Sequence, residues 1–252
     1  MARTYNAEGV VLRRTNFGEA DRLVTFLSKY KGKFTAIAKG IRKVASRRGP
    51  NLELLNHVKA HFAAGKNLDV VTEVVSVETF KKIKEDLPKL GSSFHLAEMA
   101  NEFLADGQGG RGVFDLLLKT LKLLQEEEDP QREAIILQAF DVKFLDLMGY
   151  KPRLFSCAKC GQKIQGERYF LSAEFGGVVD QNCFKSFLFA KPISQNAIKL
   201  LRFLQTEDWP RIKKLSVENS LNKETDQLLR FYIEYLMEKE LKSAKFIDQI
   251  KR

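Results

Sequence analysis

The feature that most constrains the fold is a series of short apolar runs in the first 48 residues, each ended by residues that form turns. The runs are rich in β-branched and aromatic side chains and are too short for free-standing helices: Val10–Leu12, Leu23–Leu27 and Phe34–Ala38. Gly32 lies between the second and third runs, where it can adopt a positive φ without a steric penalty. The pattern predicts short strands joined by tight turns.

The same kind of pattern continues to residue 80 and predicts five strands: Tyr5–Arg14, Arg22–Ser28, Gly32–Lys39, Leu52–Ala63 and Leu68–Phe80. In the fourth strand, Val58, Ala60 and Phe62 alternate with polar residues, which is the period of a half-buried strand. Leu54 and Leu55 would also fit a helix. Five short strands in a closed or nearly closed barrel are typical of an OB-fold.

From about residue 81 the apolar period changes to 3.6, which indicates helices. We expect a helix capped by Ser92, a leucine-dense helix at Val113–Gln125 and a helix from Pro130 to Gly149. Two further helices are expected at Ser194–Gln205 and Asn222–Lys242, each capped by its first residue. The predicted fold class is therefore α+β. Residues 1–80 are predicted to form an OB-fold domain, and residues 81–252 an all-α helical domain.

Charge is distributed unevenly along the 252 residues, whose formal net charge is +10. Residues 1–80 contain 14 Lys or Arg and seven Asp or Glu, residues 81–150 contain nine and 13, and residues 151–252 contain 19 and 12. The N-terminal and C-terminal parts of the sequence are basic and the central part is acidic. Such a distribution indicates binding to a polyanion, because charges that served only solubility would be spread evenly.

A cationic loop with several glycines leaves the third predicted strand, and such a loop suits a phosphate backbone. Together with two arginines of the first strand, its basic residues are the candidate DNA-binding residues: Arg13, Arg14, Lys39, Arg42, Lys43, Arg47 and Arg48. Phe17 and Tyr30 are candidates for stacking on bases, although a core position is also open to them. Scattered surface lysines are the alternative interpretation of the loop.

Two cysteines in the sequence CAKCG, Cys157 and Cys160, have the spacing of a zinc knuckle, and Cys183 follows 23 residues after Cys160. A complete zinc ribbon would have a second CxxC, whose first position here is Asp180. Because a carboxylate can ligate zinc, the sequence allows a metal site of three cysteines and Asp180, and equally a ribbon without metal. We expect a zinc-ribbon-like insertion at residues 154–187.

Other motifs give little support for catalysis. The sequence HVKAH has the histidine spacing of a zinc protease helix, but Val58 occupies the place of the general-base glutamate. GQGGRG at residues 107–112 lacks the GK[ST] of a phosphate-binding loop and is expected to be a flexible connection. No nucleotide cofactor is expected, and the protein is predicted not to be an enzyme.

The chain resembles the RecO family of bacterial recombination mediators. The resemblance lies in GVVLRRTNFGEADRLVTFLS, KGKFTAIAKGIRK and the SRR at residues 46–48, continues through VVTEVVSVETF, and resumes in AFDVKFLDLMGYKPRLFSCAKCG. It covers nearly the whole chain, weakly between about residues 81 and 138 and after residue 187. Family members that carry zinc have four cysteines, and this chain departs from them at Asp180.

The resemblance implies an OB-fold that binds single- and double-stranded DNA and anneals complementary strands. It also implies cooperation with RecR in placing RecA on DNA coated by single-stranded DNA-binding protein. Lys143 aligns with a basic position of the family's helical domain, where the acidic tail of that coating protein docks.

Two other functions stay open on the residues alone: an OB-fold RNA-binding protein, and an adaptor whose basic surface recruits an acidic protein. An apolar span of about 18 residues and a signal-peptide core are absent from the sequence, and the cysteines do not form a secreted disulfide framework. We expect a cytoplasmic, nucleoid-associated protein.

Overall fold

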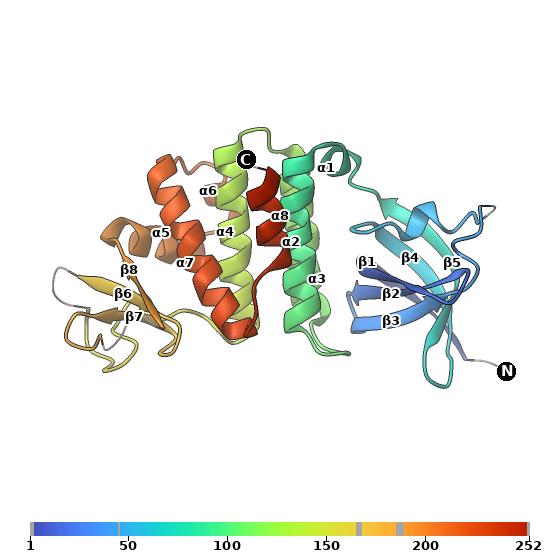
Figure 1. Cartoon of the computed structure of the whole chain (residues 1–252), viewed down its shortest axis with the longest axis horizontal. Helices are drawn as coiled ribbons and strands as arrows, with labels where there is room; N and C mark the ends of the chain where they lie inside the picture. The colour runs from blue at the N-terminus through green and yellow to red at the C-terminus, as the bar shows by residue number, and fades with distance from the viewer. Residues whose placement is uncertain (1–2, 45, 165–167, 185–188, 251–252) are drawn as a thin grey trace. The chain divides into compact units, whose positions relative to one another are not determined.

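The computed structural model describes residues 3–44, 46–164, 168–184 and 189–250 (Figure 1). The chain forms two compact units. Unit 1 comprises Met1–Gln125 together with Lys242–Arg252, and unit 2 comprises Glu126–Leu241. None of the helices in the described ranges combines the length and apolar composition that a membrane crossing requires.

A closed five-stranded barrel opens unit 1, which confirms the predicted OB-fold architecture. Its strands are β1 (Thr4–Phe17), β2 (Asp21–Ser28), β3 (Gly32–Ala38), β4 (His57–Ala63) and β5 (Asp69–Glu78). The strand order around the barrel is β1-β2-β3-β5-β4. All neighbours are antiparallel except β3 and β5, which close the barrel through the parallel pairs Ala36–Asp69 and Ile37–Val70.

The barrel core follows from the alternation of side chains along the strands. In β3, every second residue is buried from Gly32 to Ala38. The aromatic rings of Phe26, Phe34 and Phe62 meet at centroid distances of 5.2–5.6 Å, partly edge to face, which is a favourable arrangement for aromatic groups. In β4, Val58, Ala60 and Phe62 are buried, as the alternation predicts, and of the three polar residues that alternate with them His57 is buried as well.

The fourth strand begins at His57, so the prediction that it starts at Leu52 is wrong. Pro50–Leu52 forms a short 3-10 helix (η1), and Leu55 has a left-handed backbone with φ 68°. Leu52 and Leu55 are fully buried. Their apolar side chains fill the core from a loop, which the sequence pattern cannot distinguish from a strand.

Four helices complete unit 1: α1 (Lys81–Glu85), α2 (Leu87–Phe103), α3 (Gly110–Glu126) and α8 (Lys242–Ile250). The expected cap at Ser92 is wrong, because Asp86 caps α2 and accepts a hydrogen bond from the Lys89 N–H at 3.0 Å. Ser92 is buried within the helix. Asp86 followed by Pro88 in the first turn is the stronger start signal.

α8 lies along α2 although more than 130 residues separate them in the sequence (Figure 1). The Glu98 carboxylate of α2 accepts hydrogen bonds from the N–H groups of Lys242 (3.0 Å) and Ser243 (2.8 Å), the first residues of α8. Gly91 leaves space for Ile247, whose side chain would lie 3.1 Å from a Cβ at that position. A carboxylate at a helix N-terminus is stabilising, so Glu98 fixes α8 on α2.

The glycine-rich segment after α2 is attached to the barrel. The Lys33 N–H donates to the Gln108 carbonyl, and the Gly107 N–H donates to the Lys33 carbonyl, both at 2.7 Å. A Cβ on Gly32 would lie 2.4 Å from the Gln108 oxygen. The expectation of a flexible connection is therefore wrong for this segment, since paired backbone groups hold it.

Unit 2 contains α4 (Pro130–Leu147), β6 (Tyr169–Ser172), β7 (Gly177–Asp180), β8 (Ala190–Ile193), α5 (Gln195–Thr206), α6 (Trp209–Ile212) and α7 (Asn219–Met237). Ser194 caps α5 as expected and accepts from the Ala197 N–H at 3.0 Å.

The bounds Asn222–Lys242 expected for the last long helix are wrong at both ends. α7 begins at Asn219, and Asn222 is buried, with its side chain accepting a 3.0 Å hydrogen bond from Gln138 of α4. The helix ends before Glu238, whose φ is 54°.

β7, β6 and β8 form a small antiparallel sheet in that order, within and just beyond the predicted ribbon insertion. Gly177 of β7 pairs with Arg153 so closely that a Cβ would lie 2.3 Å from the Arg153 oxygen. This bridge attaches the cysteine-containing turn to the sheet.

Candidate nucleic-acid interface and candidate metal centre

The basic loop, residues 39–48, leaves the end of β3 beside the turn between β1 and β2. The Arg42 N–H donates to the Ala20 carbonyl at 2.9 Å, and its guanidinium donates to the Gly18 carbonyl at 3.2 Å. The Gly40 N–H donates to the Asp21 carboxylate at 2.7 Å. Within the described part of the loop, these bonds place the cations of residues 39–43 at one end of the barrel.

Arg48 lies across the seam where β3 meets β5. Its guanidinium donates to the carbonyls of Val71 (2.8 Å) and Lys39 (2.8 Å), and to that of Thr72 at 3.4 Å. Lys39 follows β3, and the other two acceptors lie in β5. Arg48 therefore ties the basic loop to the barrel wall.

We expect Arg48→Ala to destabilise unit 1 by about 1 kcal/mol, because it removes charge-assisted hydrogen bonds that are partly screened by solvent. Arg48→Lys should recover only part of the loss, since an ammonium cannot span the acceptors that the guanidinium reaches. Denaturant unfolding of both variants measures the effect. Equal stability of Arg48→Ala and the parent protein would contradict the anchoring role.

The seven candidate DNA-binding residues occupy three environments. Arg14 forms an ion pair with Glu53 and is half-buried. Arg48 is bound to backbone carbonyls as described above. The other five have exposed side chains: Arg13, Lys39, Arg42, Lys43 and Arg47. Arg13 follows a β-bulge in β1, where the register with β2 shifts between Val11 and Arg13.

The two candidate stacking residues lie at opposite ends of β2. Phe17 pairs with Asp21, the first residue of β2, and is 49% exposed. Tyr30 follows Ser28, the last residue, and is 81% exposed. Eight strand residues at ~3.3 Å each separate these ends by roughly 25 Å. Only Phe17 therefore accompanies the basic loop.

A second polar cluster, which the sequence patterns did not single out, lies toward the Tyr30 end of the barrel. Tyr5 donates a hydrogen bond to Asp69, and the Lys31 ammonium lies 2.5 Å from the same carboxylate. Burial and the neighbouring Asp69 raise the pKa of Tyr5 well above its ordinary value. The cluster borders a groove of about 640 Å³. Its residues are far apart in sequence, so only the barrel register reveals it.

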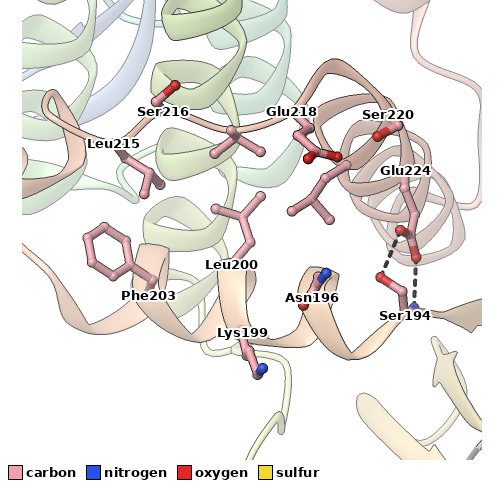
Figure 2. Close-up of a pocket in the computed structure, with 12 residues that line it drawn as sticks. Ser194, Asn196, Lys199, Leu200, Phe203, Leu215, Ser216, Glu218, Ser220 and Glu224 are labelled. Carbon is pink, nitrogen blue, oxygen red and sulfur yellow. Dashed lines mark hydrogen bonds between the residues drawn. The ribbon is translucent and has the colours of Figure 1, made fainter.

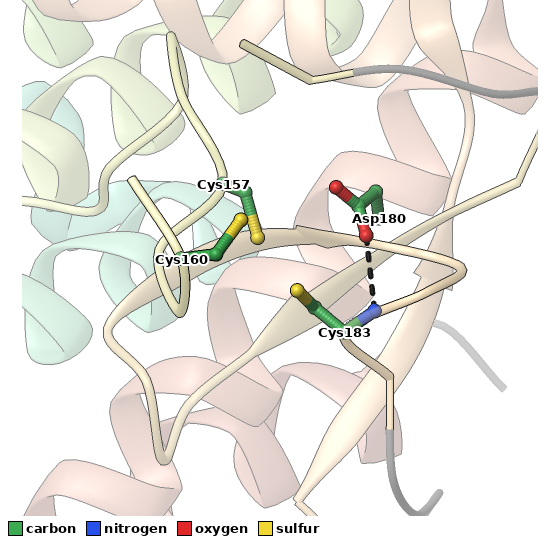
Figure 3. A group of neighbouring side chains, drawn as sticks. All are labelled: Cys157, Cys160, Asp180 and Cys183. Atoms are coloured by element: carbon green, nitrogen blue, oxygen red, sulfur yellow. Dashed lines mark hydrogen bonds between the residues drawn. The ribbon is translucent and has the colours of Figure 1, made fainter. Parts of the chain in front are cut away.

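The four predicted metal ligands, Cys157, Cys160, Asp180 and Cys183, come together in unit 2 (Figure 3). Their ligand atoms all lie within 4.8 Å of one another. Tetrahedral zinc ligands lie ~3–4 Å apart, so this set is close to a metal-binding geometry. The group could hold a metal ion.

Local structure explains how these side chains converge. Gly161 has φ 77°, and its N–H donates to the Cys157 carbonyl at 2.9 Å, which closes the turn between the two cysteines. Asp180 ends β7 and is only 7% exposed. One of its carboxylate oxygens accepts from the Cys183 N–H at 3.0 Å, as Figure 3 shows.

The electrostatics of the cluster suit a cation. Burial raises the pKa of Cys157, but backbone N–H groups of Cys160, Asp180 and Lys159 outweigh it and lower the pKa overall. The neighbouring cysteines and Asp180, with burial, raise the pKa of Cys183 to about 12. In their ionised forms the thiolates and the carboxylate would repel one another, so a divalent ion would stabilise these forms.

Lys143 lies on α4 and is half-buried. Its ammonium donates to the Glu207 carbonyl at 2.8 Å and lies 5.9 Å from the centroid of the Trp209 ring. Burial lowers the pKa of Lys143 below its ordinary value. The side chain thus contacts the end of α5 and the start of α6.

The histidines of HVKAH lie on β4 and not on a helix. Residues four apart in a strand are separated by ~13 Å, so His57 and His61 cannot bind one ion together. His57 is buried with its Nε2 2.8 Å from Glu8, and His61 lies 2.8 Å from the Thr72 hydroxyl. Both rings therefore have polar partners on or beside the strand, and the pair does not have the geometry of a zinc protease site.

A pocket of about 570 Å³ lies between α5 and the segment leading into α7 (Figure 2). Two of its polar lining residues bind each other, since Glu224 accepts from the Ser194 hydroxyl at 2.8 Å and from the Ser194 N–H at 2.7 Å. The remaining wall includes Leu200, Phe203 and Lys199. The Ser194 hydroxyl also caps α5, so this pair supports the helix start.

Comparison with known proteins finds relatives along the whole chain. The family profile described as "Recombination protein O N terminal" matches residues 1–80, and the profile "Recombination protein O C terminal" matches residues 84–245. The DNA repair protein RecO of Roseiflexus sp. (strain RS-1) is 32% identical over 250 residues, which cover 99% of this chain and 87% of that protein. The DNA repair protein RecO of Symbiobacterium thermophilum is 31% identical and covers 98% of both chains. The chain therefore belongs to the RecO family.

Proposed function

We propose that this protein is a non-catalytic DNA-binding mediator. Its family gives it a role in DNA repair and recombination. In that role it binds single- and double-stranded DNA, anneals complementary strands and, with RecR, helps to load RecA onto DNA coated by single-stranded DNA-binding protein. It acts in the cytoplasm, at the nucleoid.

The observation that supports this proposal most is the exposed, positively charged end of the OB-fold barrel. Lys39, Arg42 and Lys43 are exposed there, and Phe17 is exposed at the adjoining end of β1. Cations that neutralise phosphates release counterions and lower the repulsion between two strands. Annealing by such a surface requires no covalent step.

Residues 1–80 form the DNA-binding domain. Residues 81–252 form the helical domain, with the insertion at 154–187, and contain the docking region for a protein partner. The acidic tail of single-stranded DNA-binding protein docks on the helical domain near Lys143. Exposed Leu147, one turn further along α4, supplies an apolar contact beside that cation.

An annealing assay on complementary oligomers that are precoated with single-stranded DNA-binding protein tests the proposal. We expect the protein to accelerate duplex formation, and to do so less when the coating protein lacks its acidic tail. A rate equal to that of the coated strands alone would overturn the mediator role. Competition by RNA oligomers is the control. A protein that recognises the 2′-hydroxyl would bind RNA more tightly than DNA, so unlabelled RNA would displace labelled DNA more effectively than unlabelled DNA does.

The cysteine cluster binds zinc, with Asp180 as the fourth ligand. Three thiolates and one carboxylate match the donors that zinc accepts, and the buried carboxylate already faces them (Figure 3). The ion would supply a structural link between the turn at Cys157 and the end of β7.

We expect one equivalent of zinc in the purified protein. Asp180→Asn should weaken zinc binding by more than about tenfold, because it removes a charged ligand, while Asp180→Cys should retain the metal. Metal analysis and competition with a chelator measure both. Glu174→Gln, an exposed acid of the same ribbon, is the matched control. A protein that neither contains nor takes up zinc would establish the metal-free ribbon.

A further inference from the structure

Phe155 is an exposed aromatic side chain that makes a cation–π contact with an arginine held in place by a hydrogen bond. It lies two residues before Cys157 and is 59% exposed. The guanidinium of Arg202, from α5, lies 4.9 Å from the centroid of its ring. Arg202 is held in place because its Nε also donates to the Leu154 carbonyl at 2.9 Å. The ring is thus oriented by a cation without being buried.

The ribbon around Phe155 carries an excess of positive charge. Residues 151–164, 168–184 and 189–193, the described part, contain six Lys or Arg and two Asp or Glu. One of the two acids, Asp180, is buried in the cysteine cluster. In these ranges Glu174 is then the one exposed carboxylate, so the ribbon surface favours a polyanion.

Two of these cations, Arg153 and Lys163, belong to backbone segments next to Phe155. Ser156, the next residue, forms a β-bridge with Lys163, and Arg153 forms a bridge with Gly177. Both Arg153 and Lys163 have exposed side chains. Lys159 is not included, since its ammonium donates to the Cys183 carbonyl at 3.3 Å.

We propose that the ribbon carries a second binding site for single-stranded DNA, in which an unpaired base stacks on Phe155 and the neighbouring phosphates contact Arg153 and Lys163. An aromatic ring flanked by cations is the common platform for single strands, because every base has a face that can stack. This inference rests on the proposed function. In this arrangement unit 2 binds one DNA strand and the barrel binds another.

Photo-crosslinking locates the stacked base. Full-length protein is irradiated with a single-stranded oligomer that contains 5-iodouracil, and the adducts are mapped by mass spectrometry. We expect adducts on Phe155 as well as on barrel peptides. Phe155→Ala should abolish the ribbon adduct, and Phe155→Trp should retain it. Adducts confined to residues 1–80 in the parent protein would overturn the second site.

Binding measurements test the cations. Arg153→Glu with Lys163→Glu should reduce the number of oligomers bound per chain from two to one, and Phe155→Ala should weaken the second binding step by roughly tenfold. The matched control is Lys199→Glu with Lys223→Glu, which makes the same charge change at exposed positions of unit 2. Ribbon and control variants that bind alike would overturn the inference.

The failure of this inference differs from failure of the proposed function. If the barrel variants lose DNA and the ribbon variants behave like their control, only the second site is wrong. If the barrel variants bind DNA as the parent protein does, the proposed role of the basic loop is wrong, whatever the ribbon does. Unchanged thermal unfolding and metal content establish that each variant is folded.

Discussion

Charge reversal of the basic loop, by Arg42→Glu, Lys43→Glu and Arg47→Glu together, is expected to lower the affinity for single-stranded DNA by roughly a hundredfold at ~0.1 M salt. Each phosphate contact contributes about 0.7 to the slope of log K against log salt for single strands, so the slope should fall by about 2. Titrations of a labelled oligomer at several salt concentrations measure both quantities. Arg48 is left intact because its hydrogen bonds hold the loop against β3 and β5.

The control for this experiment makes the same change in charge elsewhere in unit 1. Lys82, Lys119 and Lys122 are exposed on α1 and α3. Their reversal to glutamate should alter affinity far less, since a general loss of positive charge acts only at long range and is screened by salt. A control variant that loses as much affinity as the loop variant would show that net charge, and not the loop, determines binding.

Replacement of Gly177 by alanine is expected to destabilise unit 2 by about 3 kcal/mol and to lower its metal content. The added Cβ would lie 2.3 Å from the Arg153 oxygen and 2.6 Å from the Arg153 nitrogen, both backbone atoms that cannot rotate away. The bridge would then open, and the hydrogen bond from the Val178 N–H to the Arg153 carbonyl, 2.8 Å, would be lost. The turn that carries Cys157 would separate from the strand that carries Asp180.

Gly149→Ala is the control that distinguishes the steric clash at Gly177 from the loss of stability that follows when any glycine with an unusual backbone conformation is replaced. Gly149 has φ 81° and no atom within 4 Å of the added Cβ, so alanine there meets backbone strain alone. We expect a cost of about 1–2 kcal/mol for it, with the metal content unchanged. Denaturant unfolding and metal analysis compare the two variants. If Gly177→Ala keeps its zinc, the bridge is not needed to assemble the cluster.

The sequence predicts the barrel and the convergence of the three cysteines and Asp180 well because both depend on short-range patterns. Alternating side chains and turn-forming glycines define β1, β2 and β3 to within a few residues. The spacing of Cys157 and Cys160, with Asp180 three residues before Cys183, predicts a cluster that the fold then assembles. Such signals are local, so they survive without knowledge of the tertiary structure.

The errors arise where tertiary contacts override local signals. Leu52 and Leu55 are apolar because they fill the core from a loop, and Asn222 is polar because it bonds to Gln138 inside the unit, not because it caps a helix. α8 depends on Glu98, 144 residues before Lys242. The carbonyls that hold Arg48 belong to backbone, whose position no side-chain pattern reports.

The capping of α8 by Glu98 has a consequence for biosynthesis. The first unit takes its closing helix from the end of the described chain, with the whole of the second unit between the two parts. A ribosome must therefore translate Glu126–Leu241 before α2 meets its partner. Until then the face of α2 around Gly91 stays uncovered on the nascent chain, where chaperones can reach it.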